Sequence, residues 1–152
     1  MHREENKAIV TVSSRFDGLP KIRKFVRDSS NRISGGSFSE EDITILELAA
    51  TEVATNIIRH AYHGDEHQSV RLEALHQGDR LVLRFLHRGK FFQPDQIPEP
   101  DFNSGQEGGW GLFIIEQSVD EMTYTLEEDG SCVIELKKGY KKGVNNEQEH
   151  DP

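Results

Sequence analysis

The chain has 152 residues, a length that suits one domain with a single hydrophobic core. Hydrophobic residues make up 34% of it, and no apolar run approaches the roughly 20 residues that cross a bilayer. The first six residues lack the apolar segment of a signal peptide, and the single Cys132 cannot form an internal disulfide, so we expect a cytoplasmic protein. The lack of a bilayer-spanning apolar run argues against a membrane partner. The net charge of −9 repels phosphate backbones on average, so nucleic acid is not expected as a partner, whereas a basic protein surface is.

The first part of the chain predicts one strand followed by two helices. Residues 8–13 are few and rich in β-formers, which predicts an edge strand. Residues 19–33 carry apolar side chains at helical spacing and predict a first helix. A longer helix follows over residues 40–62, with Ser39 as its N-cap and Gly64 at its end.

The longer helix carries two neighbouring stripes of side chains. The core-facing stripe consists of Ile43, Leu46, Ala50, Val53 and Ile57. Beside it runs a second stripe of Ile45, Ala49, Glu52, Asn56 and His60. A carboxylate, an amide and an imidazole therefore follow one another at about 6 Å along the helix axis. Because apolar residues continue this line, we expect it to be partly covered, like the wall of a small-molecule site. Taken alone, the same pattern also fits a solvated polar flank.

The second part of the chain predicts two hairpins. Residues 69–75 and 80–86 alternate apolar and polar side chains on either side of a Gly-Asp turn. Residues 122–126 and 132–136 pair across a second turn that contains Gly130. Strands that arrive in hairpins indicate an antiparallel or mixed sheet with about three helices on one face, which is a two-layer α+β sandwich.

A long stretch with little periodicity separates the hairpins, over residues 87–108. Loops of this length inside a compact domain are usually functional or disordered. An apolar helix is predicted after it, from Leu112 to Val119. We therefore expect one domain over residues 8–137, with a short arm before it at residues 1–7 and a polar tail at residues 138–152.

Two glycine-containing segments flank the long loop. Residues 105–112, Gly-Gln-Glu-Gly-Gly-Trp-Gly-Leu, lead directly into the last helix, where glycines let backbone N–H groups approach an anion at a helix N-terminus. The alternative is a flexible loop that merely closes onto a helix. At the other end, His87-Arg88-Gly89 leaves a strand, and Gly89 marks either a tight turn beside a ligand or an ordinary strand exit.

These motifs, in this order and at these distances, resemble the GHKL ATPases, and most closely the short serine/threonine kinases that act as anti-sigma factors in bacterial partner switching. The sequence Glu52-x-x-x-Asn56-x-x-x-His60-Ala61-Tyr62 is similar to the family's N box, and residues 108–115 are similar to its second glycine box. The resemblance covers about residues 8–137. It implies a Bergerat-type ATP-binding fold that holds ATP between the main helix and a lid at residues 87–108.

The resemblance also implies cofactors, partners and residue roles. ATP and Mg²⁺ are the implied cofactors, with Asn56 as the metal ligand and Glu52 as the general base. The implied ATP contacts are Asn56, His60, His87, Gly89, Gly108, Gly109, Gly111 and Leu112. The chemistry suits these roles, because Mg²⁺ prefers oxygen ligands and a carboxylate can accept the proton of an attacking serine hydroxyl. The implied partners are a sigma factor and an anti-sigma-factor antagonist, and a homodimer is implied as well.

The chain departs from the family at His87. The family's first glycine box reads Asp-x-Gly, and its Asp accepts the adenine amino group, whereas this chain has His87-Arg88-Gly89. A neutral imidazole accepts one hydrogen bond but carries no negative charge, and an unperturbed histidine loses this acceptor below about pH 6.5, where both ring nitrogens donate. Two functions therefore stand side by side: a protein kinase with weakened ATP binding, and a non-catalytic regulator of the same fold that acts by contact with its partner.

Overall fold

The structure, a computed structural model, describes residues 7–89 and 111–140, with the backbone alone for residues 111–114. The strands in these ranges are β1 (Ala8–Ser13), β2 (Ser69–Gln77), β3 (Arg80–His87), β4 (Glu121–Leu126) and β5 (Cys132–Gly139). The helices are α1 (Leu19–Ser34), α2 (Glu40–Asn56) and α3 (Gly111–Ser118), with a 3₁₀ turn η2 (Phe16–Gly18) before α1 and a π turn η3 (Ile57–Ala61) after α2.

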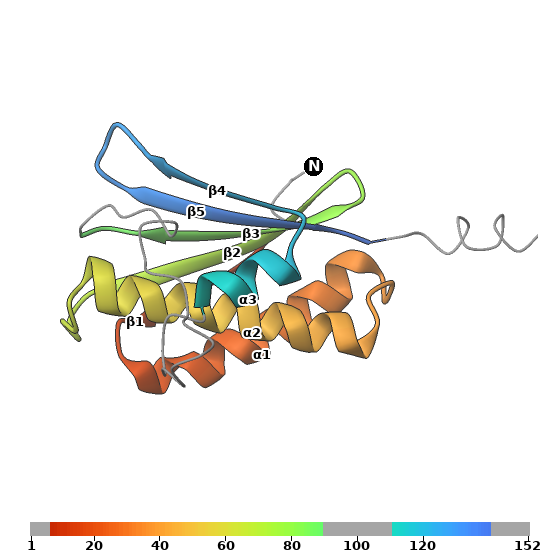
Figure 1. Ribbon diagram of the computed structural model, residues 1–152, viewed down its shortest axis with the longest axis horizontal. Coiled ribbons are helices and arrows are strands. Elements are labelled where there is room, and N and C mark those ends of the chain that lie inside the picture. The colour runs from red at the N-terminus through yellow and green to blue at the C-terminus, as the bar shows by residue number, and fades with distance from the viewer. Residues whose placement is uncertain (1–6, 90–110, 141–152) are drawn as a thin grey trace, which may run out of the picture.

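The described residues form two layers. The strands make one sheet in the order β1-β2-β3-β5-β4, and each neighbouring pair is antiparallel. The helices α1, α2 and α3 lie on one face of this sheet (Figure 1). This arrangement confirms the predicted α+β sandwich and places residues 8–13 at a sheet edge, as predicted. In the described part of the chain, no helix is both long and apolar enough to cross a bilayer.

The helix ends follow local sequence signals. The hydroxyl of Ser39 accepts a hydrogen bond from the backbone N–H of Asp42 at 3.0 Å, which caps α2 as predicted. Helix α1 has proline in its first turn and ends where Gly35 takes a left-handed conformation with φ of 65°.

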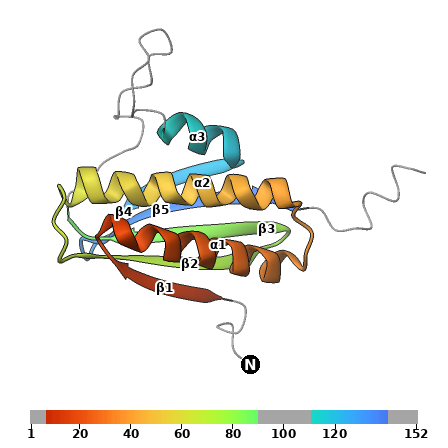
Figure 2. The same ribbon diagram turned by 90° about the horizontal axis from the view of Figure 1, so that it is seen from below.

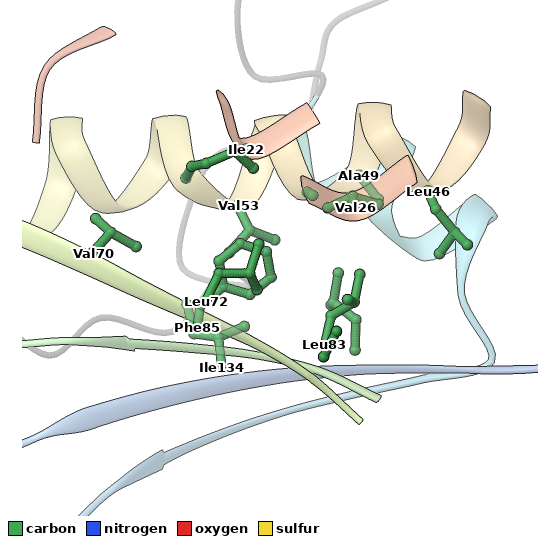
Figure 3. Packing of buried hydrophobic residues seen from close by; sticks show 14 of the residues in the cluster. Ile22, Val26, Leu46, Ala49, Val53, Val70, Leu72, Leu83, Phe85 and Ile134 are labelled. Carbon is green, nitrogen blue, oxygen red and sulfur yellow. The ribbon is translucent and has the colours of Figure 1, made fainter. Parts of the chain in front are cut away.

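The core lies between the helices and the sheet (Figure 3). The predicted core-facing stripe of α2 is buried at every position: Ile43, Leu46, Ala50, Val53 and Ile57. These side chains pack with Ile22 and Val26 of α1 against Leu72, Phe85 and Ile134 of the sheet. Burial of apolar surface on one face of α2 therefore fixes which way its second stripe points.

Strand β5 continues beyond its predicted end at Leu136. The N–H of Gly139 donates to Oδ2 of Asp120 at 2.7 Å, and the N–H of Tyr140 donates to the carbonyl of Asp79 at 2.9 Å. The Tyr140 ring is buried and meets the Phe38 ring edge-on, with 5.5 Å between centroids. Residues 138–140, expected in the polar tail, therefore belong to the folded domain. The sequence did not predict this end of the strand, because Lys137 and Lys138 are partly exposed and interrupt the apolar pattern.

The face of the sheet turned away from the helices carries a cluster of charges around Glu73. Its carboxylate is 3% exposed and accepts from Arg71 at 2.9 Å and from Arg84 at 3.1 Å, while Lys7 lies 3.4 Å away. Arg84 also pairs with Glu135 at 2.9 Å. This cluster therefore links β2, β3 and β5 on the sheet's open face with Lys7, the residue before β1.

Candidate functional site

Glu52 and Asn56 lie on one face of α2, one helical turn apart. Asn56 is 8% exposed and Glu52 is half-buried, so the second stripe is partly covered, as the apolar residues in it predicted. Burial raises the pKa of the Glu52 carboxyl, and the positive charge of Arg59 partly opposes this rise. A carboxylate with a raised pKa is a stronger proton acceptor than an exposed one.

A π turn replaces the α-helix directly after Asn56. The N–H of Tyr62 donates to the carbonyl of Ile57 at 3.1 Å, which is a bond between residues five apart. The prediction of a regular helix through Tyr62 is therefore wrong in its last turns. A turn closed by such bonds holds more residues than an α turn, so the side chains after Asn56 are rotated away from the positions that a regular α-helix would give them. Turns of this kind occur often at functional sites.

His87 is the last residue of β3 and is 3% exposed. Its Nδ1 lies 2.9 Å from the carbonyl oxygen of Arg88. A carbonyl oxygen only accepts, so Nδ1 carries the proton of the neutral ring. Burial lowers the pKa of the imidazole, although its bond to the Arg88 backbone acts in the opposite direction. The neutral, accepting form of His87 therefore persists below the pH at which an exposed histidine would charge.

Gly89 follows His87 in a left-handed conformation with φ of 92°. A Cβ at this position would lie 2.8 Å from two ring carbons of Tyr62 and 2.9 Å from the carbonyl oxygen of Ala61. Glycine is required here because the chain passes against the end of η3. The close neighbour of Gly89 that the structure shows is therefore the protein's own Tyr62.

Two of the predicted ATP contacts, Gly111 and Leu112, lie at the start of α3. Gly111 and Leu112 form the first turn of α3, which lies beside α2 (Figure 2). A helix N-terminus at this place favours an anion in principle, because its first N–H groups have no partner within the helix. Gly108 and Gly109 lie outside the described residues, as does the expected lid apart from its first residues, His87 to Gly89.

The sequence matches known proteins over most of its length. Residues 12–136 match the histidine kinase-like ATPase domain. The chain belongs to the histidine kinase-like ATPase family. It is 32% identical over 128 residues to the serine-protein kinase RsbW of Listeria monocytogenes, covering 76% of this chain and 82% of that protein.

Two further relatives of this ATPase domain carry related names. A serine-protein kinase RsbW of Halalkalibacterium halodurans is 26% identical over 137 residues, or 85% of this chain and 80% of that protein. The anti-sigma F factor of Oceanobacillus iheyensis is 28% identical over 103 residues, or 64% of this chain and 70% of that protein. The predicted resemblance to the anti-sigma kinases is therefore confirmed.

The ATPase domain brings its predicted site residues together in two groups. Glu52 and Asn56 share one face of α2, and His87 and Gly89 meet the end of η3. Tyr62, directly after η3, contacts both His87 and Gly89 of the second group. These contacts were not predicted, although Tyr62 stands in the motif that resembles the N box. The signal that could have found it is the pairing of a large aromatic residue with a glycine that must tolerate close contact.

Proposed function

We propose that this chain is an ATP-dependent serine/threonine protein kinase of the anti-sigma type, which binds a sigma factor and phosphorylates an anti-sigma-factor antagonist in the cytoplasm. The observation that carries the proposal is the pair on α2, a half-buried carboxylate with a raised pKa one turn from a buried amide. The relatives named serine-protein kinase and anti-sigma F factor support the choice of reaction and partners.

The side chains fit the groups that such a reaction needs. Asn56 offers a nearly buried amide oxygen, which suits Mg²⁺ because this ion prefers oxygen ligands and keeps waters and phosphates as its others. Bound there, Mg²⁺ would neutralise charge on the phosphates of ATP. Glu52 would accept the proton of the substrate hydroxyl. The oxygen of that hydroxyl bonds to the γ-phosphorus of ATP while the bond from this phosphorus to ADP breaks. The backbone at Gly111, in the first turn of α3, would contribute N–H groups near the phosphates.

The base of the nucleotide would be read at the end of β3. We assign the adenine amino group to His87, whose neutral ring carries its proton on Nδ1, toward the Arg88 carbonyl. A neutral acceptor makes a weaker bond than the carboxylate of the family's Asp. The affinity of this protein for ATP should therefore be lower than that of relatives with Asp at this position.

Transfer of labelled phosphate from γ-labelled ATP to a cognate antagonist tests this function. Glu52→Gln should reduce transfer by roughly 10²–10⁴-fold, the contribution typical of a general base, with little change in ATP affinity. The matched control is Glu41→Gln, which neutralises an exposed carboxylate in the first turn of the same helix. Full transfer by the Glu52 variant would refute the assigned role.

A second candidate function is a non-catalytic regulator that binds its partner without using ATP. The buried neutral His87 favours it, since this residue replaces the charged acceptor of the family's nucleotide site. The two functions predict different results in one experiment. A kinase should transfer phosphate to the antagonist when ATP and Mg²⁺ are added, whereas a regulator of this kind should leave the antagonist unmodified and bind it with the same affinity.

A further inference from the structure

The outward side of α2 and η3 carries exposed side chains on both sides of Glu52. Leu48, one helical turn before Glu52, is 48% exposed. Arg59, seven residues after Glu52, is exposed and lies over the ring of Phe16, with 5.7 Å from its Cζ to the ring centroid. Phe16 is itself 47% exposed. Two of the four large apolar side chains that are exposed in the described residues therefore flank the proposed general base.

Arg59 is a cation close to that base. Its charge acts on the Glu52 carboxyl and opposes the rise in pKa that burial causes. In the described part of the chain Arg59 forms no ion pair, and its guanidinium rests on the Phe16 ring instead. A ring that stacks against a guanidinium restricts its position and leaves the N–H donors at its edge able to bind a carboxylate. Arg59 can therefore bind an acidic group that approaches Glu52 from outside.

We propose that the surface formed by Leu48, Glu52, Arg59 and Phe16, the α2 ridge, docks the segment of the anti-sigma-factor antagonist that carries the phosphoacceptor hydroxyl. In this complex an apolar side chain of the segment covers Leu48 and an acidic side chain binds Arg59, while the hydroxyl lies at Glu52. The inference rests on the proposed function, because it names the surface by which the substrate reaches the same site.

The arrangement of the helices sets the side from which the hydroxyl arrives. Helix α2 lies between α1 and α3 (Figure 2), and the proposed phosphate contacts are at the start of α3. With ATP on the α3 side, a protein hydroxyl reaches Glu52 from the exposed side of α2. Leu48 and Arg59 are the exposed side chains that it meets there.

The spacing along α2 predicts the pattern of the docked segment. At a rise of about 1.5 Å per residue, Leu48 precedes Glu52 by about 6 Å and Arg59 follows it by about 10 Å. An extended chain advances about 3.3 Å per residue. The apolar residue should therefore lie about two positions from the phosphoacceptor, and the acidic residue about three positions away on its other side.

An acidic segment fits this part of the surface although the net charge of the protein is −9. Helix α1, which packs beside α2, carries one acid, Asp28, and five basic residues: Lys21, Arg23, Lys24, Arg27 and Arg32. One of these pairs with Asp28, and another pairs with two carboxylates of α2. The remaining positive charge on α1 opposes the repulsion that the whole protein exerts on an acidic partner.

The test measures phosphate transfer to the antagonist protein used in the assay of the proposed function, with KM determined separately for the antagonist and for ATP. Leu48→Ala and Arg59→Gln each remove one contact. Ile9→Ala is the control for the first, because it truncates an exposed apolar side chain on β1. Arg32→Gln is the control for the second, because it neutralises an exposed arginine in the last turn of α1. Thermal unfolding verifies that all four variants fold, and the assay is run at about pH 8, where Glu52 stays ionised after the loss of Arg59.

Docking on the α2 ridge predicts a loss that is specific for the antagonist. Leu48→Ala and Arg59→Gln should each raise KM for the antagonist by about 5- to 30-fold, with little change in kcat or in KM for ATP. The effect of Arg59→Gln should shrink at high salt, which screens charge, whereas the effect of Leu48→Ala should persist. The controls should behave like the wild-type protein. An unchanged KM in either ridge variant, or an equal rise in its control, would overturn the inference.

A binding measurement separates this inference from the proposed function. Calorimetric titration of the same antagonist into each protein needs no ATP. If the wild-type protein binds the antagonist but transfers no phosphate, the proposed kinase function fails, and weaker binding by both ridge variants still supports docking on the α2 ridge. If the wild-type protein transfers phosphate and the ridge variants bind and react as it does, only the docking inference fails. Neither binding nor transfer by the wild-type protein would overturn both.

Discussion

Replacing His87 by Asp should tighten ATP binding, because it restores a charged acceptor for the adenine amino group. A hydrogen bond to a charged group contributes about 1.5–3 kcal/mol and a neutral one about 0.5–1.5 kcal/mol. The difference of about 1–2 kcal/mol corresponds to roughly 5- to 30-fold in affinity. The position is 3% exposed, so little water competes for the bond. The same change loses the edge contact with Tyr62, so His87→Asp should be less stable without nucleotide.

The assay is calorimetric titration of ATP and GTP, with Mg²⁺, into the wild-type protein and two variants at position 87. His87→Asn is the matched control, since it loses the same ring contact but keeps a neutral acceptor. His87→Asp should bind ATP more tightly and prefer it more strongly over GTP, whose oxygen at the equivalent place also accepts. Two results would refute the reasoning that His87 contacts the base. One is that the wild-type protein binds ATP as tightly as His87→Asp does, and the other is that His87→Asn tightens ATP binding as much as His87→Asp does.

Three further predictions concern stability and pH. Gly89→Ala should destabilise the fold by about 1–3 kcal/mol or more, measured by urea unfolding, and should cost clearly more than Gly78→Ala, which shares a positive φ but has open space around it; equal costs would contradict the contact with Tyr62. Glu73→Ala should cost about 1–3 kcal/mol in the same assay because its arginines lose a buried partner, whereas Asp28→Ala, which breaks an exposed pair, should cost under about 1 kcal/mol; similar losses would reject the role of the Glu73 cluster. Because the pKa of His87 is lowered in the folded protein, its protonation should oppose folding as pH falls from about 6.5 toward the folded-state pKa, and ATP affinity should persist through pH 6.5 and decline only at lower pH; a decline centred at pH 6.5 in calorimetry would contradict the burial of this ring.

The sequence predicted the buried residues and strand pairs that follow from a regular spacing of apolar side chains. The stripe from Ile43 to Ile57 was correct at each position because apolar residues at helical spacing have one way to reach the core. The hairpins were correct because a Gly-containing turn leaves no other partner for adjacent strands. Hairpins report only neighbours along the chain, so the pairing of β3 with β5 across α3 was beyond the reach of the pattern.

The geometry around the candidate site could not be read from the sequence. An α turn and a π turn can hold the same sequence, so the change of helix type after Asn56 left no signal in the sequence. The contact between Tyr62 and Gly89 joins residues that are far apart in the sequence, and no local pattern reports such a contact. The lowered pKa of His87 depends on burial created by the whole fold, so residue type alone suggested titration near pH 6.5.

The most direct test of the central claim is calorimetric titration of ATP, with and without Mg²⁺, into the wild-type protein and into Asn56→Ala. Asn56 is buried on the face of α2 that carries Glu52, and we assign its amide oxygen to the metal. We predict that the wild-type protein binds ATP in a Mg²⁺-dependent manner and that folded Asn56→Ala loses this dependence together with most of its affinity. Unchanged Mg²⁺-dependent binding in the folded variant, or the absence of ATP binding by the wild-type protein, would contradict the account.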